Sequence, residues 1–322
     1  MLAAGCGGDD GGAPARSTTS ATAAAATTTE ADADVATDPS GGCGREADAP
    51  TLLDERPGDV PLTFDAAGTE RTYRLGVPPS YARDTPAPLV LNLHGSGSNA
   101  VQASVYSDLP AAAAERGIIT VTPDAVAGQW ELTPTGLDDD FLAALVADVE
   151  GRYCVDRARV HVVGMSLGAY KAALTACRHP DVFASAALVT VELFIGDCDP
   201  LAVVAFHGTA DAVAAYGEGG TVDPATTPNA GLPGARENMA NWADAGGCGP
   251  EPELTDVGDD VVRHTYGGCD EGVDVVLHTI EGGGHTWPGS DIVIGDPSLT
   301  TATIDATALI LDWFEDHPRL RR

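Results

Sequence analysis

A serine between two glycines is the residue of this chain best suited to covalent chemistry. Ser166 stands in the pentapeptide G-M-S-L-G at residues 164–168, after a strand-like segment and before a helix-like one. A serine on such a sharp strand-to-helix turn presents its hydroxyl above the edge of a sheet, and small flanking residues permit the turn. The N-terminus of the following helix favours developing negative charge. The pattern therefore predicts a nucleophilic serine.

An alkyl hydroxyl is a poor nucleophile until a neighbouring base takes its proton. The chain has eight histidines, and His285 is the best placed of them, because it follows a late strand-like segment within the sequence G-G-G-H-T-W-P-G at residues 282–289. Its three preceding glycines permit a tight, exposed loop. His264 and His278 fall inside predicted strands and His317 ends the last predicted helix, so we expect structural roles for these three.

A third group must orient the base and stabilise the imidazolium that forms. Asp211 is the first carboxylate beyond the strand-like segment 201–206, in the motif H-G-T-A-D at residues 207–211. Its rivals are Asp199, which precedes that segment, and Asp223, which lies in the following loop. Capping of a turn is the ordinary role of an aspartate after a strand. The order Ser166, Asp211, His285 is nevertheless the chain order typical of α/β-hydrolases.

Acyl transfer also needs hydrogen-bond donors for the oxyanion of the tetrahedral intermediate. One donor in this arrangement is the backbone N–H of the residue after the nucleophile, which is Leu167 here. The other comes from the loop after an early strand, and the small residues at 94–98 follow such a strand, so Ser96 is the expected second donor. For His94 we expect a structural role beneath this loop.

These residues need elements that bring them to one edge of a sheet. Strand-like and helix-like segments alternate along the chain, which predicts an α/β fold with a mostly parallel central sheet and helices on both faces. Together with the motif at Ser166 and the order of the three candidate catalytic residues, this predicts the α/β-hydrolase fold, with no large lid domain. The predicted strands are 61–65, 71–77, 89–93, 118–122, 160–163, 183–191, 201–206, 261–265 and 273–279. The predicted helices are 108–116, 138–150, 167–177, 236–245 and 303–314.

Composition divides the 322 residues into a tail and one domain. Residues 7–50 are rich in Gly, Ala, Ser, Thr, Asp and Pro, and such a segment buries too little apolar surface to offset its ordering entropy, so it is predicted to be a disordered linker. Residues 51–318 then form a single catalytic domain. The net charge of −31 repels nucleic acid and anionic lipid, which excludes both as partners.

The seven cysteines show no C-x-x-C spacing, so we expect no metal or redox site of that kind. Cys6 follows the sequence L-A-A-G, which resembles the lipobox of bacterial lipoproteins, and residues 1–6 are therefore interpreted as the remnant of a lipoprotein signal with Cys6 as the lipidation site. The six remaining cysteines suffice for three disulfides in an oxidising compartment. The protein is expected to be extracellular, with membrane contact only through the lipid anchor.

Several short motifs occur in the order seen in a known group of enzymes. They are L-H-G-S at 93–96, Y-C-V-D at 153–156, G-M-S-L-G at 164–168, H-G-T-A-D at 207–211, Trp242 with Cys248, and G-G-H-T-W-P-G at 283–289. Over residues 58–318 the chain resembles the poly(3-hydroxybutyrate) depolymerase and feruloyl esterase group, of the carbohydrate esterase family 1 type. The resemblance implies a secreted, cofactor-free α/β-hydrolase that acts on esters of hydroxy acids, or on aromatic or acetyl esters of polysaccharides. Ala169 departs from the glycine common in the group.

The resemblance also bears on cysteines and tryptophans. It implies a disulfide between Cys248 and Cys269. We add the hypothesis that the cysteines expected at the lower ends of their elements, away from the active site, form two further pairs, Cys177 with Cys198 and Cys43 with Cys154. Trp130 and Trp287 are candidates to line the substrate cleft, and for Trp130 core packing is an equal alternative.

Three functions therefore compete. The first is a secreted serine carboxylic ester hydrolase, in which Ser166 attacks the carbonyl of an ester substrate (a small molecule, an oligomer or a polysaccharide-linked group) and an acyl-enzyme is hydrolysed by water. The second is a serine peptidase on the same fold. The third is a non-catalytic cell-surface lipoprotein that has kept the fold.

Overall fold

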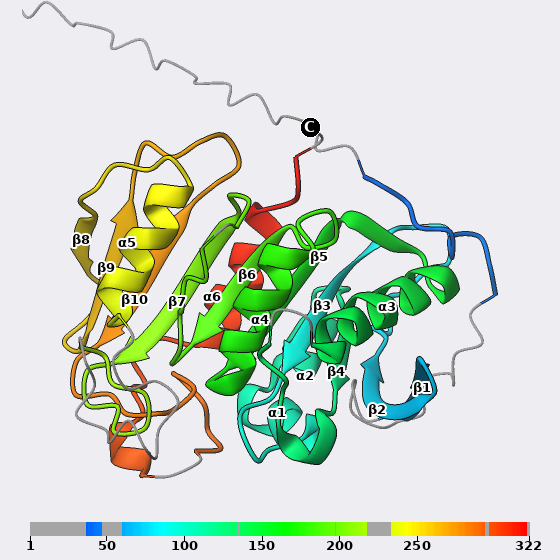
Figure 1. Ribbon diagram of the computed structural model, residues 1–322, viewed down its shortest axis with the longest axis horizontal. Coiled ribbons are helices and arrows are strands. Elements are labelled where there is room, and N and C mark those ends of the chain that lie inside the picture. The colour runs from blue at the N-terminus through cyan, green and yellow to red at the C-terminus, as the bar shows by residue number, and fades with distance from the viewer. Residues whose placement is uncertain are drawn as a thin grey trace, which may run out of the picture. The chain divides into compact units, whose positions relative to one another are not determined.

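The computed structural model describes residues 37–46, 60–133, 136–196, 198–217, 233–293 and 296–320. Within these ranges the strands form one ten-stranded sheet (Figure 1). In the order in which they lie side by side, the strands are β1 (Val60–Ala66), β2 (Thr69–Gly76), β4 (Ile119–Pro123), β3 (Ala87–Leu93), β5 (Val155–Met165), β6 (Ser185–Val189), β7 (Ala202–Gly208), β10 (Val275–Ile280), β9 (Val261–Tyr266) and β8 (Glu253–Asp256).

The middle of the sheet is parallel and its margins are antiparallel. Strands β4, β3, β5, β6, β7 and β10 run parallel, whereas β1 with β2, β2 with β4, β10 with β9 and β9 with β8 pair antiparallel. Every residue of β6 and β7 is buried. A parallel sheet covered on both faces selects such continuous runs of small and branched residues, as in S-A-A-L-V of β6.

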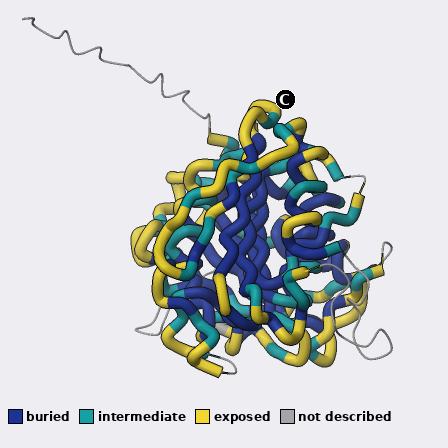
Figure 2. The backbone as a smooth tube through the Cα atoms, turned by 90° about the vertical axis from the view of Figure 1, so that its left-hand side faces the viewer, coloured by how far each residue is buried: buried dark blue, intermediate teal, exposed yellow. Residues whose placement is uncertain are grey.

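Helices cover both faces of the sheet and enclose two hydrophobic cores. Helices α3 (Leu137–Arg152), α4 (Leu167–Arg178) and α5 (Ala235–Ala245) pack on one face, and α1 (Ala100–Ser107), α2 (Leu109–Glu115) and α6 (Ala306–Asp316) pack on the other (Figure 1). Two short 3-10 turns, η1 (Val126–Gly128) and η2 (Pro297–Leu299), lie in loops. Figure 2 shows buried backbone through the middle of the domain and exposed segments around it. This is the predicted arrangement of a mostly parallel sheet between two helical layers.

The aspartates at the start of α3 have a role beyond the one their position suggests. A helix N-terminus favours negative charge by itself. In the structure, Asp138 also pairs with the buried Arg71 at 2.8 Å, and Asp139 pairs with Lys171 of α4 at 2.6 Å and with Arg178. Lys171, the chain's one lysine, is completely buried. The acidic first turn of α3 thus joins α3 to α4.

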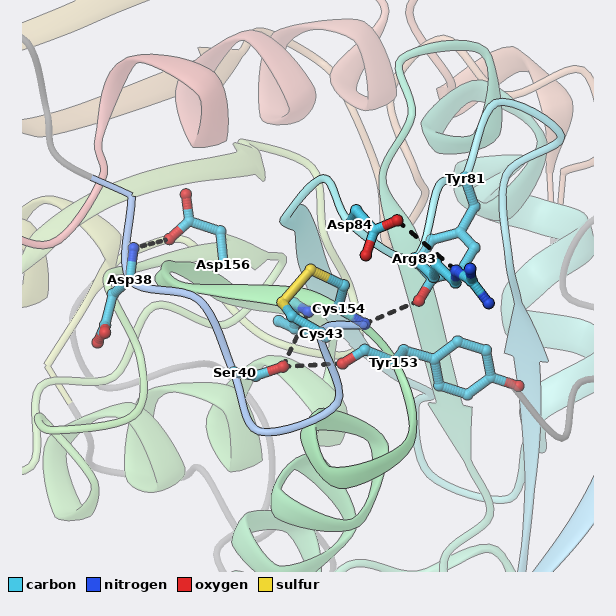
Figure 3. The surroundings of a disulfide bond; sticks show 10 residues. Asp38, Ser40, Cys43, Tyr81, Arg83, Asp84, Tyr153, Cys154 and Asp156 are labelled. Atoms are coloured by element: carbon cyan, nitrogen blue, oxygen red, sulfur yellow. Dashed lines mark hydrogen bonds and ion pairs between the residues drawn. A yellow bond between two sulfur atoms is a disulfide. The ribbon is translucent and has the colours of Figure 1, made fainter. Parts of the chain in front are cut away.

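Residues 37–46, which the sequence analysis assigns to the linker, lie against the start of β5, and we call this segment the strap. The hydroxyl of Ser40 donates to the carbonyl of Tyr153 at 2.8 Å, and the backbone N–H of Asp38 donates to the carboxylate of Asp156 at 2.8 Å (Figure 3). A disulfide joins Cys43 to Cys154. These bonds fix the strap to the domain, although its composition alone predicts a disordered segment. The rest of the predicted linker, with Cys6, lies outside the described residues.

Two further disulfides close shorter loops. Cys177 at the end of α4 is joined to Cys198, and Cys248 after α5 is joined to Cys269. All three pairs are those that the sequence analysis expects. In the part of the chain that the structure describes, no helix is long and apolar enough to span a bilayer. The expectation of no large lid concerns in part residues 218–232, between β7 and α5, which lie outside the described residues.

Candidate active site

Ser166 occupies the junction between β5 and α4 with a strained backbone. Its φ of 57° and ψ of −123° lie in a region that L-residues rarely adopt. Its N–H donates to the carbonyl of Val189 at 2.9 Å, which ties the turn to the neighbouring strand β6. The side chain is only partly buried. The hydroxyl therefore sits at the carboxyl edge of the parallel strands, where ligands bind in open α/β sheets.

The glycines on either side of Ser166 are required by close approach of backbone segments. A Cβ on Gly164 would lie 2.2 Å from the carbonyl oxygen of Gly168, and a Cβ on Gly168 would lie 2.2 Å from that of Leu93. Neither contact is possible for a real side chain. The sharp turn thus depends on both glycines, and Gly168 also allows α4 to pack against the end of β3.

Asp211 and His285 meet at the same edge of the sheet. The Nδ1 atom of His285 lies 2.7 Å from Oδ2 of Asp211, whose carboxylate is fully buried, while the imidazole is 17% exposed. The other carboxylate oxygen of Asp211 accepts the backbone N–H groups of Val213 and Ala214, each at 2.8 Å. Asp211 is thereby held by its own loop and directed at one nitrogen of His285.

Backbone hydrogen bonds join the two loops that carry these residues. The N–H of Ala210 donates to the carbonyl of Gly283 at 2.8 Å, and the N–H of Thr209 donates to that of Ile280 at 2.9 Å. A Cβ on Gly208 would lie 2.2 Å from the carbonyl oxygen of Gly283. Because β7 and β10 are adjacent parallel strands, their carboxyl ends place residues 74 positions apart in contact.

The electrostatics of the pair fix its protonation. Burial by itself raises the pKa of Asp211, but hydrogen bonds from His207 and His285 and the charge of His285 outweigh burial and hold that pKa well below its usual range. Asp211 is therefore ionised and accepts a hydrogen bond from the protonated Nδ1 of His285. The lone pair of the imidazole then lies on Nε2, which is the tautomer that a general base needs.

The loop after β3 lies against Ser166. A Cβ on Gly95 would lie 3.4 Å from the Cβ of Ser166. Ser96 is exposed and its hydroxyl is hydrogen-bonded to the side-chain amide of Gln129. Leu167 is the first residue of α4, so its N–H has no acceptor within the helix. The assignment of Ser96 and Leu167 to an oxyanion hole stays a prediction.

His94 supports this loop from below. Its Nε2 accepts the backbone N–H of Ala125 at 3.0 Å, so the proton is on Nδ1, which donates to the carbonyl of Gly95 at 2.7 Å. Burial lowers the pKa of His94, in agreement with a neutral ring. The neutral histidine thus braces the backbone on which Ser96 stands.

Trp130 and Trp287 are both almost completely buried, which agrees with the alternative of core packing; their assignment to the substrate cleft stays a prediction. Trp130 is 4% exposed; its indole N–H donates to the carbonyl of His94 at 2.8 Å, and its ring packs on the His94 ring. Trp287 is 3% exposed, and its N–H donates to the hydroxyl of Thr307 at 2.9 Å. These hydrogen bonds and ring contacts fix the orientation of both indoles.

Two residues beside Asp211 escaped the sequence analysis. His207 and Glu192 are both buried, and Nδ1 of His207 lies 2.7 Å from a carboxylate oxygen of Glu192. Glu192 stands close behind the apolar run of β6, which is a weak signal for a buried acid that needs a partner. His207 is the first residue of the motif H-G-T-A-D, and nothing in the sequence indicates a role for it apart from the motif.

Comparison with known proteins gives a consistent picture. The family model described as Esterase PHB depolymerase matches residues 71–213. The protein named "Putative esterase NocK" from Nocardia uniformis subsp. tsuyamanensis is 33% identical over 269 residues, which cover 73% of this chain and 78% of that protein. Feruloyl esterase B of Piromyces equi is 30% identical over 223 residues, which cover 65% of this chain and 41% of that protein.

The fold also resembles that of solved esterases. The acetyl xylan esterase from Aspergillus awamori superposes with a TM-score of 0.57 at 14% identity, over 80% of this chain and 99% of that one. At this identity the likeness concerns the fold alone. The predicted α/β-hydrolase fold is confirmed, with Ser166 at the position where a strand meets a helix.

Proposed function

This chain belongs to the esterase family of the PHB depolymerase type and is a carboxylic ester hydrolase, and we propose that it works through an acyl-enzyme on Ser166, with His285 as the base and Asp211 as its partner. The observation that carries the proposal is the 2.7 Å contact between Nδ1 of His285 and the buried carboxylate of Asp211. This contact lies at the carboxyl edge of the parallel strands, the edge at which Ser166 follows β5.

In the first half of the reaction, Nε2 of His285 takes the hydroxyl proton of Ser166 while the oxygen attacks the ester carbonyl. The imidazolium that forms is stabilised by the ionised Asp211, which does not itself take the proton. The N–H groups of Leu167 and Ser96 receive the oxyanion. Such donors are each worth about a hundred- to a thousandfold in rate.

In the second half, His285 returns the proton to the departing alcohol, and the acyl group stays on Ser166. Water then loses a proton to the same Nε2 and attacks the acyl-enzyme, which releases the acid and restores the serine. Substrates proposed on the names of the relatives are feruloyl esters, acetyl esters of polysaccharides, and oligomeric hydroxyalkanoates.

We also propose that the protein acts outside the cytoplasm, tethered by a lipid at Cys6. Three disulfides among the described residues support this location, because such bonds persist in oxidising compartments.

The decisive experiment compares wild type with Ser166→Ala on p-nitrophenyl acetate and butyrate, methyl ferulate, acetylated xylan and a hydroxybutyrate oligomer. We expect the variant to lose essentially all turnover and to resist labelling by a fluorophosphonate, while the preferred ester defines the substrate class. A wild type that is inert on every ester and unlabelled would contradict the mechanism and favour a non-catalytic surface protein. Ser104→Ala, on α1 and remote in sequence, is a control for serine loss.

A further inference from the structure

A second histidine lies beside Asp211, near the same carboxylate oxygen that contacts His285. His207 is the penultimate residue of β7 and is 2% exposed. Its Nδ1 lies 2.7 Å from Oε2 of Glu192, and its Nε2 lies 2.9 Å from the carbonyl oxygen of Ala214 and 3.5 Å from Oδ2 of Asp211. The histidine is therefore enclosed between two carboxylates, one of which belongs to the catalytic site.

The partners of His207 determine its protonation state. A carbonyl oxygen and an ionised carboxylate only accept hydrogen bonds, so a ring with such acceptors at both nitrogens must carry a proton on each. Burial alone lowers the pKa of His207, but the charge of Glu192 and the hydrogen bonds to Asp211, Glu192 and Ala214 raise that pKa to about 10. His207 is thus a buried cation at neutral pH.

We propose that His207, held between Glu192 and Asp211, is a positioning residue that fixes the Asp211 loop and places a positive charge beside the catalytic pair. The proposal rests on the function proposed above for Ser166, Asp211 and His285. The contact to the carbonyl of Ala214 braces the same loop whose N–H groups hold the Asp211 carboxylate. The positive charge offsets part of the negative charge that would otherwise favour protonation of His285.

Other groups around His207 hold the arrangement in place. The indole N–H of Trp242, on α5, donates to the backbone carbonyl of Glu192 at 2.9 Å, and the Tyr216 ring packs edge-on against the His207 ring. The hydroxyl of Tyr216 is hydrogen-bonded to Thr279 of β10. The charged or titratable groups that surround His207, directly or through Tyr216 and Thr279, are Glu192, Asp211, Tyr216, Arg236, His264, Glu281 and His285.

The main test is the pH profile of kcat/KM for His207→Gln. Glutamine can keep a hydrogen bond but carries no charge, so the acid limb should move to higher pH by about one unit, and the plateau should fall several-fold. A histidine with only a packing role would lower the plateau or the melting temperature but leave the acid limb in place. An unshifted acid limb in an active, folded variant overturns the proposal.

A matched control separates the effect of charge from that of core disruption, and a second variant covers the case in which His207→Gln does not fold. His161 on β5 is also completely buried and stacks on Phe314, so His161→Gln disturbs the core to a similar degree, and its acid limb should coincide with that of wild type. If His207→Gln does not fold because Glu192 is left without its cation, Glu192→Gln/His207→Gln removes both charges. The acid limb should then shift in the same direction by a smaller amount, since the lost cation is nearer to Asp211 than the lost carboxylate.

A direct measurement needs no catalysis. In wild-type protein labelled with ¹⁵N-histidine, NMR should show one ring, assigned by its loss in the variant, with both nitrogens protonated throughout pH 5–9. A neutral His207 ring at pH 7 would refute the proposal. An inactive wild type with a doubly protonated His207 would instead count against the proposed function alone.

Discussion

At the scale of single residues, the site depends on how completely the Asp211 carboxylate is engaged. One oxygen accepts two backbone N–H groups and the other accepts His285. This leaves the imidazole one orientation relative to the loop. Of the rival acids, Asp199 precedes β7 and so lies toward the opposite end of the strand from the site, and Asp223 lies outside the described residues.

Replacing Asp211 by Asn should therefore lower kcat by about ten thousandfold while the fold is kept, because an amide donor in place of Oδ2 would reverse the tautomer of His285. Initial rates on p-nitrophenyl acetate, with circular dichroism to check folding, measure the effect. Asp199→Asn is the control and should keep wild-type activity. If Asp199→Asn lowers kcat as much as Asp211→Asn does, the acid of the triad is Asp199 and not Asp211.

At the scale of elements, the turn between β5 and α4 works only because three backbones come together. The carbonyls of Leu93 and Gly168 occupy the places where side chains of Gly168 and Gly164 would start. Any Cβ there must push α4 away from β3 or β5.

We expect Gly168→Ala to lower the free energy of unfolding by about 3 kcal/mol and to abolish fluorophosphonate labelling of Ser166, since overpacking displaces the turn. Gly151→Ala, in the last turns of α3 with open space around the added methyl, should instead raise stability by roughly 0.5–1 kcal/mol. Urea unfolding of the three proteins gives both values. A Gly168→Ala variant as stable and as readily labelled as wild type would show that the turn tolerates a side chain.

The sequence was a good guide to elements with a strong local signal. The apolar run at 89–93 and the motifs around Ser166, Asp211 and His285 lie where the structure has β3 and the carboxyl ends of β5, β7 and β10. Helix α1 was missed because its sequence A-V-Q-A-S-V-Y-S has little helical pattern, and its start depends on the side-chain cap of Asn99. Strand β8 was missed because its four residues, mostly exposed, form the outer edge of the sheet.

Other contacts between elements, in residues outside the motifs, were beyond the reach of the sequence. Glu192 and His207 are 15 residues apart, and they meet only because β6 and β7 pair in one particular register. The inward turn of Trp130 depends in the same way on the carbonyl of His94.

At the scale of the whole molecule, the disulfides differ in how much chain they enclose. Cys43 and Cys154 are 111 residues apart, whereas Cys177 and Cys198 are 21 apart. The paired replacement Cys43→Ser/Cys154→Ser should lower the free energy of unfolding by about 5 kcal/mol, and Cys177→Ser/Cys198→Ser by about 3 kcal/mol, on the loop-entropy scale. Denaturant unfolding measures both. If Cys177→Ser/Cys198→Ser lowers the free energy of unfolding more than Cys43→Ser/Cys154→Ser does, strain or structure in the unfolded chain, and not loop length, governs the effect.

Buried histidines make stability depend on pH. Burial lowers the pKa of His161 to about 3 and that of His278 to about 4. Below pH 6.5, both side chains are therefore protonated in the unfolded chain while they stay neutral in the folded protein. Stability should fall as the pH drops from 6.5 toward 4, by up to about 1.4 kcal/mol per pH unit for each histidine. His207 acts in the opposite sense, because its raised pKa means that its contribution is complete below pH 6.5 and is lost as the pH rises toward 10.

Urea unfolding between pH 4 and 10 should thus show a maximum near pH 6.5. His278→Gln should flatten the acid side and leave the alkaline side unchanged. An acid side equally steep in this variant would assign the dependence to other groups.

The strap crosses the amino end of β5, and Ser166 follows its carboxyl end. Eleven residues of strand lie between, which is roughly 35 Å at the usual rise per residue. The last described residues lie at the same end of the domain as the strap (Figure 1). There, the backbone N–H of Arg319 donates to the carbonyl of Ala158. A carrier attached beside the strap or at Arg319 would therefore hold the domain by the end opposite Ser166 and leave the carboxyl edge of the sheet free for substrate.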